Sequence, residues 1–70
     1  AEGLDAGLEL LDGLSDEPGL QRYHLYHSAR ADLLRRAGRP GPARDAYTRA
    51  LALCTNPVER RFLEDRIADL

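Results

Sequence analysis

Residues 31–50 read ADLLRRAGRPGPARDAYTRA, and the spacing of small and apolar residues in this stretch decides the fold. On both sides of Gly38 such residues recur every three or four positions, which is the period of an α-helix with one buried face. The positions concerned are Ala31, Leu34, Ala43, Tyr47 and Ala50. Gly38 is expected to end the first helix in a left-handed conformation, and Pro42 suits the first turn of the second. The stretch therefore predicts a helical hairpin.

The same periodicity continues outward along the chain and predicts about four helices. They cover about residues 4–14, 20–37, 42–54 and 57–69. Gly and Pro residues separate them, and no sustained alternation of apolar and polar residues indicates a strand. The start of the last helix is clearly marked, because Asn56 can cap it and Pro57 fits its first position. We expect one all-α domain over residues 1–70, made of antiparallel helical hairpins that pair the first helix with the second and the third with the fourth.

The apolar faces of these helices predict the core. The expected core residues are Leu8, Leu11, Tyr23, His27, Ala31, Leu34, Ala43, Tyr47, Ala50, Phe62 and Ile67. The helix over 20–37 is apolar on two sides, so it should lie between neighbours, whereas the helix over 57–69 is apolar on one side and should cover an end of the array.

The composition argues against several classes of function. The net charge is −2 and acidic and basic residues are interleaved, so bulk attraction to nucleic acid or to a membrane surface is not expected. No apolar run approaches the roughly 20 residues that cross a bilayer, and no leader sequence is seen. The single cysteine, Cys54, excludes an internal disulfide and fits a reducing compartment. We therefore expect a cytoplasmic protein.

No residues have the spacing of a catalytic site. The chain contains no nucleophile–base pair, glycine-rich phosphate loop or recognised metal signature, so it is expected to be no enzyme and to need no cofactor. His24 and His27 lie three apart on one helix and could meet a metal ion. Nothing supplies further ligands at a recognised spacing, since Cys54 stands alone, so both histidines are interpreted as structural.

The arginines also receive structural interpretations. Arg30 should face inward between His27 and Leu34, where a guanidinium needs a carboxylate partner. The candidates for that partner are Glu9, Asp12 and Asp45. Four more arginines gather near the turn after residue 37 and are interpreted as a solvated helix end rather than a nucleic-acid site, because no aromatic residue is interleaved to stack bases. These are Arg35, Arg36, Arg39 and Arg44.

The order small, large, Gly, small, aromatic, small in residues 31–50 resembles the tetratricopeptide repeat. The likeness covers about one repeat, residues 24–57, with a partial repeat over 1–19, the main repeat over 20–54 and a capping helix over 56–70. The sequence departs from the family pattern at three places. His27 replaces the early aromatic residue, Arg30 replaces the usual leucine, and the proline that follows the repeat is displaced to Pro57.

A longer likeness runs through residues 23–39, 43–47, 50–53 and 55–63, and includes 3–8 at the start. These segments resemble the C-terminal end of bacterial RNA polymerase sigma factors of the extracytoplasmic-function type that carry a tetratricopeptide-like extension. The resemblance implies a regulatory, protein-interacting domain that acts in transcription initiation. Its partners would be RNA polymerase, the upstream sigma regions or a regulator. A free-standing peptide-binding adaptor of the tetratricopeptide type is the alternative.

The resemblance also implies where a partner binds. In tetratricopeptide-like arrays the outward face of the first helix of each repeat lines the concave surface. Carried over position by position, that face consists of Leu25, Ser28, Asp32, Arg35 and Arg36. Helical periodicity independently places Ser28, Asp32 and Arg35 on one polar stripe, which Leu25 interrupts.

Overall fold

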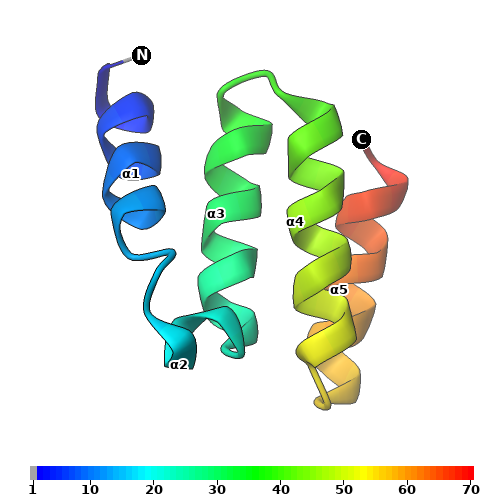
Figure 1. Cartoon of the computed structure of the whole chain (residues 1–70). Helices are drawn as coiled ribbons and strands as arrows, with labels where there is room; N and C mark the ends of the chain where they lie inside the picture. Colours follow the sequence, from blue (N-terminus) through cyan, green and yellow to red (C-terminus); the bar gives the residue numbers. More distant parts are fainter. Residues whose placement is uncertain (1) are drawn as a thin grey trace.

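A computed structural model describes residues 2–70, and it is all-helical over that range, as the sequence predicts. The helices are α1 (Glu2–Gly13), α2 (Pro18–Gln21), α3 (His24–Arg36), α4 (Pro40–Leu53) and α5 (Pro57–Ala68). Figure 1 shows α1, α3, α4 and α5 in a row, with the short α2 between the lower ends of α1 and α3. None of the helices within residues 2–70 combines the length and apolarity that crossing a bilayer would require.

The hairpin of α3 and α4 is the centre of the fold, and its turn is built as the sequence predicts. Gly38 has φ of 76°, the only positive value within residues 2–70. The Gly38 amide donates to the Arg35 carbonyl (3.1 Å) and the Arg39 amide donates to the Leu34 carbonyl (2.9 Å). This pair of bonds is the Schellman motif, which satisfies carbonyls that the helix end would leave free.

Small residues bring α3 and α4 close together. Ala31 and Leu34 on α3 are buried against Ala43 and Ala50 on α4, and the ring of Tyr47, only 1% exposed, fills the space between them. Leu8 from α1 and Leu63 from α5 complete the core from the two sides. The predicted core is therefore correct for the central hairpin.

Two predicted core residues are wrong. Tyr23 is 49% exposed because it precedes the first residue of α3 and has an extended backbone. Phe62 is 48% exposed because α5 turns Leu63, its neighbour, into the core. Leu11 and Ile67 are half-buried. The buried residues that the prediction omitted are Tyr26, Ala46, Cys54 and Leu63.

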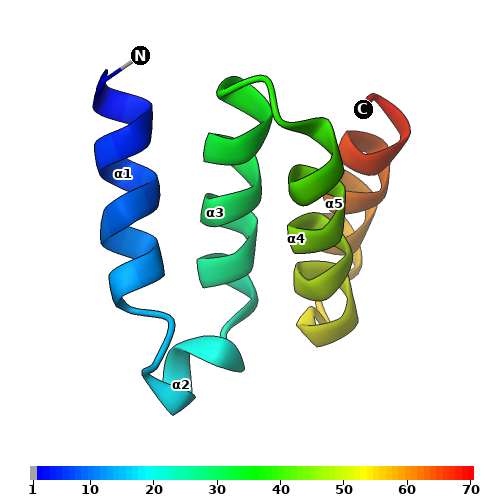
Figure 2. The same cartoon turned by 45° about the horizontal axis from the view of Figure 1, so that its top comes forward.

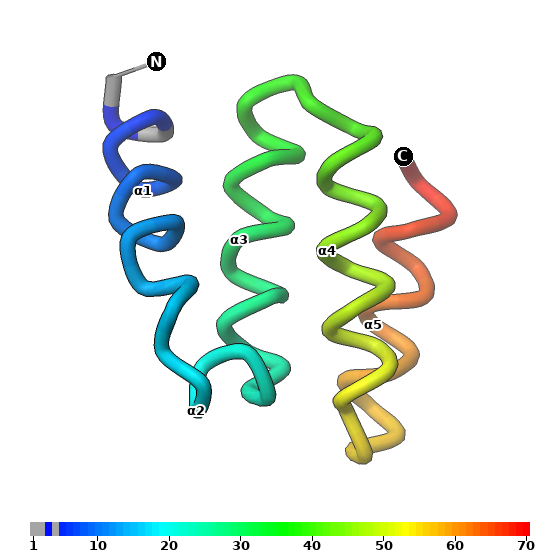
Figure 3. The backbone as a smooth tube through the Cα atoms, viewed as in Figure 1, coloured from blue at the N-terminus to red at the C-terminus, as the bar shows by residue number. Residues whose placement is uncertain are grey.

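The helix predicted over 20–37 is interrupted. Arg22 and Tyr23 lie outside α2 and α3, so the structure has five helices where about four were expected. Figure 3 shows the backbone leaving α2 and turning before it enters α3. His27 donates to the Gln21 carbonyl (2.9 Å) and the Gln21 side chain donates to the Ser15 carbonyl (2.6 Å). These bonds satisfy backbone carbonyls around the interruption.

The helices form a thin layer in which each packs on its neighbours in the chain. The described residues measure 33 × 28 × 16 Å along their principal axes. α1 packs on α3, α3 on α4 and α4 on α5, and Figure 2 shows the same order from a second side. Both predicted pairings exist, α1 with α3 and α4 with α5, but the most extensive contact is between α3 and α4.

Candidate functional site: a groove between α3 and α5

A groove lies between α3 and α5, with α4 contributing one residue. Its larger hollow is about 560 Å³ and is lined by Leu25, Ser28, Ala29, Asp32, Tyr47, Phe62 and Arg66. A smaller hollow of about 150 Å³ is lined by His24, Leu25, Ser28, Glu59, Phe62 and Leu63. The two share Leu25, Ser28 and Phe62, so we treat them as one feature, the α3–α5 groove.

Three of the five residues predicted to bind a partner line this groove: Leu25, Ser28 and Asp32. The other two are arranged around Asp32. Nη2 of Arg35 lies 2.7 Å from Oδ1 of Asp32, and Nη1 of Arg36 lies 3.9 Å from Oδ2 of the same carboxylate. Asp32 therefore holds both guanidinium groups beside the groove, and neither arginine lines it.

Arg35 connects the polar stripe of α3 to the core. Its Nε donates to the Tyr47 hydroxyl at 3.3 Å, in addition to the contact of Nη2 with Asp32. The hydrogen bond with Asp32 and, second, that with Tyr47 raise the pKa of the Arg35 guanidinium above its ordinary value. The two hydrogen bonds hold the side chain in place, which gives Arg35 a structural role next to the groove.

The walls of the groove expose two large apolar side chains. Leu25 on α3 is 45% exposed and Phe62 on α5 is 48% exposed, and both line the two hollows. The sequence analysis assigned Phe62 to the core and so missed it as a site residue. The sequence offered no signal against this assignment, because Val58, four residues earlier on the same face of α5, is also apolar, and only the structure shows that it is strongly exposed.

Arg66 is the second residue that the sequence analysis missed, because it does not belong to the apolar side of the last helix and no partner was considered for it. Its guanidinium carbon lies 5.0 Å from the centroid of the Phe62 ring, a cation–π arrangement. Its Nε is buried and has no hydrogen-bond acceptor anywhere in residues 2–70. Buried donors are nearly always paired, so Nε of Arg66 is an unsatisfied donor in a residue that lines the groove.

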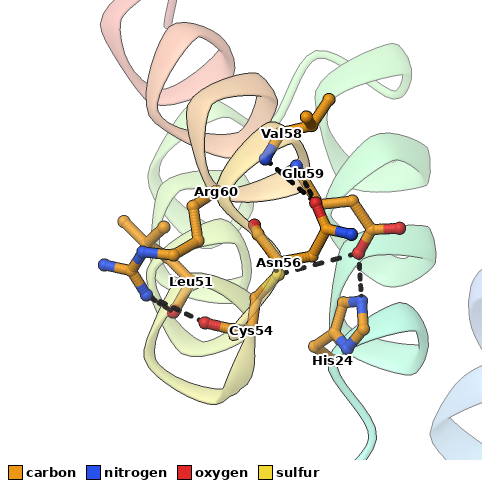
Figure 4. Close-up of polar contacts among 7 residues, drawn as sticks. All are labelled: His24, Leu51, Cys54, Asn56, Val58, Glu59 and Arg60. Atoms are coloured by element: carbon orange, nitrogen blue, oxygen red, sulfur yellow. Dashed lines mark hydrogen bonds and ion pairs between the residues drawn. The ribbon is translucent and has the colours of Figure 1, made fainter.

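The end of the groove is fixed by the turn between α4 and α5 (Figure 4). Oδ1 of Asn56 accepts from the amides of Val58 (2.9 Å) and Glu59 (3.1 Å), which confirms the predicted cap. Nη1 of Arg60 donates to the carbonyls of Leu51 (2.8 Å) and Cys54 (2.9 Å). The Asn56 cap and the Arg60 hydrogen bonds therefore fix both ends of the turn and hold the residues within it in place.

This turn brings Cys54 and Glu59 to His24. Nε2 of His24 donates to Oε2 of Glu59 at 2.5 Å, and the Cys54 thiol lies 3.6 Å from the same oxygen. The three side chains could hold a metal ion, because their donor atoms all lie within 4.8 Å of one another. The sequence analysis saw no further ligand for His24 since it compared spacings along the chain, and these residues meet only through the fold. His27 is buried elsewhere, against the Gln21 carbonyl.

Arg30 has one of its predicted partners but is less buried than the sequence analysis expected. Nε of Arg30 lies 3.1 Å from Oδ1 of Asp12, one of the three partners considered, although the Arg30 side chain is half-buried rather than enclosed. Arg39 and Arg44 are exposed at the beginning of α4, and Arg44 donates weakly to the Leu70 carbonyl (3.4 Å).

Comparison with known proteins adds one relative. The chain is 36% identical over 69 residues to a protein of Rhizobium meliloti (strain 1021) that is described only as uncharacterized. The match covers 99% of this chain and 16% of the relative, so the chain corresponds to a small part of a much longer protein. No family model matches the chain. No solved structure matches it either.

Proposed function

We propose that this chain is a protein-interaction domain that binds a partner protein in the α3–α5 groove and does not act by catalysis. The observation that carries the proposal is the combination of exposed Leu25 and Phe62 with the unsatisfied Nε of Arg66 in one groove. The complementary ligand is a protein segment with an apolar side chain for the first two residues and a carboxylate for Arg66. Interfaces commonly gain most of their affinity from a few such apolar and arginine contacts.

The partner we propose is RNA polymerase, the upstream sigma regions or a regulator of them, in the cytoplasm. Support comes from the likeness of residues 23–63 to the C-terminal extension of extracytoplasmic-function sigma factors. The relative from Rhizobium meliloti supports a domain within a larger protein, because this chain matches 16% of its length. The domain would then regulate transcription initiation.

A free-standing peptide-binding adaptor of the tetratricopeptide type is the second candidate. It is favoured by the position of Leu25, Ser28 and Asp32, which line the groove at positions carried over from that family's concave face. The two candidates use the same surface and differ in the partner, so one binding experiment with defined proteins separates them.

The experiment immobilises the chain and measures retention of purified RNA polymerase core and of purified sigma regions. Two groove variants, Leu25→Asp and Phe62→Asp, should each weaken retention by about tenfold or more, the effect of losing one interface anchor. Leu10→Asp is the matched control, since Leu10 is 68% exposed on α1 and does not line the groove.

Each outcome has one meaning. If Leu25→Asp and Phe62→Asp weaken retention and Leu10→Asp does not, the result supports the groove as the binding site. Equal losses in all three variants overturn the groove assignment. If neither polymerase nor the sigma regions are retained by the parental chain, the sigma-factor role is wrong, and the adaptor becomes the better explanation.

A further inference from the structure

Three side chains from three different segments converge at one end of the array. His24 is the first residue of α3, Cys54 directly follows α4, and Glu59 is in the first turn of α5. Their donor atoms are an imidazole nitrogen, a thiol sulfur and a carboxylate oxygen, all within 4.8 Å of one another (Figure 4). We propose that His24, Cys54 and Glu59 form a binding site for a divalent transition-metal ion of the zinc class.

Of two donor separations in the cluster, one fits a tetrahedral ion as it stands and the other requires a local adjustment. Zinc binds nitrogen and oxygen at about 2.0–2.2 Å and sulfur at about 2.3 Å, which places neighbouring ligand atoms roughly 3.2–3.7 Å apart. The separation of Cys54 Sγ and Glu59 Oε2 is 3.6 Å and lies within that range. Nε2 of His24 and Oε2 of Glu59 are hydrogen-bonded at 2.5 Å, so an ion that displaces the shared proton needs them to separate by roughly 1 Å.

The donor set selects the kind of ion. Calcium takes six to eight oxygen ligands and magnesium needs an octahedron of oxygens and waters, and one carboxylate supplies neither. A mixed set of imidazole, thiolate and carboxylate suits zinc and its spectroscopic substitute cobalt(II). A hydrogen-bonded cluster that binds no ion is the competing explanation, and the two differ in what titration with metal shows.

The surrounding contacts hold the three donors in place. The Asn56 side chain caps α5 through the Glu59 amide, and Arg60 binds the Cys54 carbonyl. Cys54 is 2% exposed and donates to the Asn56 carbonyl at 3.7 Å as well as to Glu59. Preorganised ligands of this kind lose little freedom when an ion binds, which favours affinity.

Three protein ligands leave a fourth position for a small molecule or a group from a partner. His24 and Glu59 both line the smaller hollow of the α3–α5 groove. Sites with three protein ligands and one exchangeable position are typical of catalytic or exchangeable zinc rather than of closed structural sites. The bound ion would also connect α3 to the turn between α4 and α5, and so stabilise a small domain.

The test titrates the reduced 70-residue chain with cobalt(II) and then displaces it with zinc, without any partner protein. We expect saturable binding of one ion per chain, with intense visible bands from tetrahedral cobalt and a near-ultraviolet band from thiolate-to-cobalt charge transfer. Displacement by zinc should abolish both signals. Because the measurement uses metal alone, its result does not depend on whether the proposed partner binding is correct.

Variants assign the ligands. His24→Gln, Cys54→Ser and Glu59→Gln should each weaken zinc binding by at least about tenfold, and Cys54→Ser should also remove the charge-transfer band. Glu64→Gln is the matched control, because Glu64 is an exposed acid on the same helix as Glu59. Circular dichroism verifies that each variant remains helical.

The proposal is overturned if the parental chain gives no charge-transfer band, a result that needs no variant and no assumption about folding. It is equally overturned if Cys54→Ser binds zinc as tightly as the parent, or if Glu64→Gln weakens binding as much as Glu59→Gln does.

Discussion

The Tyr47 hydroxyl accepts a hydrogen bond from Nε of Arg35 at 3.3 Å, although the Tyr47 ring is one of the most deeply buried side chains in the fold. One residue of α4 thus fills the space between α3 and α4 and reaches the edge of the α3–α5 groove with its polar end. Core packing and the shape of the groove are therefore connected through a single side chain.

Replacing Tyr47 by Ala should largely unfold the chain. Removing a buried aromatic ring costs about 3–5 kcal/mol, and small domains have little stability beyond that. Tyr47→Phe keeps the ring and should lower the free energy of unfolding much less. Urea unfolding followed by circular dichroism compares the two variants, and near-parental stability of Tyr47→Ala would show that the packing is wrongly described.

The turn at Gly38 allows a matched pair of glycine substitutions. Gly38→Ala should destabilise the chain by about 1–2 kcal/mol, because a side chain disfavours the left-handed conformation at φ of 76°. Gly41→Ala adds a Cβ in open space within α4, but Pro42 follows and disfavours a helical residue with a side chain before it, so the free energy of unfolding should change by much less. A thermal unfolding midpoint that falls as far for Gly41→Ala as for Gly38→Ala would contradict the turn geometry.

The cap of α5 gives a third prediction. Asn56→Ala removes the acceptor for two backbone amides and should cost about 1 kcal/mol. Thr55→Ala, at the preceding exposed position, should leave the free energy of unfolding within about 0.5 kcal/mol of the parent. If the two substitutions change the free energy of unfolding in urea equally, the Asn56 cap makes no specific contribution to stability.

Substitutions of Arg35 and of Leu25 should differ in their effect on thermal stability, although the sequence assigns both residues to the partner-binding face. Arg35→Glu places a carboxylate beside Asp32 and removes the contacts with Asp32 and Tyr47, so it should lower the thermal midpoint before any partner is added. Leu25→Asp changes a half-exposed side chain and should leave the midpoint nearly unchanged while it weakens partner binding. Scanning calorimetry of the two variants alone checks the difference, and equal midpoints would show that Arg35 makes no structural contribution.

The sequence predicts the central hairpin well because local chemistry determines it. The local backbone structure is set by Gly38, by the Pro residues and by the small residues on α3 and α4. Each of these determines the conformation of the chain only within a few residues of itself. The interruption at Arg22 and Tyr23 was not predictable in this way, because no Gly or Pro marks it within 20–37 and the side chains of Gln21 and His27, which bond carbonyls six residues away beside it, have no recognised signature in the sequence.

Errors at the site have a different origin. Phe62 and Leu63 are adjacent and both apolar, and a rotation of α5 by one residue decides which of them is buried. Periodicity alone leaves that choice open. The meeting of His24 with Glu59, 35 residues later, depends on how α3 and α5 both pack on α4 and has no signature in the spacing of residues.

The thin layer of helices also determines the order in which the chain should open. α1 packs on α3, α3 on α4 and α4 on α5, so most contacts join helices that are close in sequence, and cooperativity weakens with distance along the array. α4 packs against both α3 and α5, whereas α1 packs mainly against α3 at the edge of the layer. Amide hydrogens in α4 should therefore exchange with solvent slowest and those in α1 fastest, through opening events that release α1 while the hairpin of α3 and α4 stays intact.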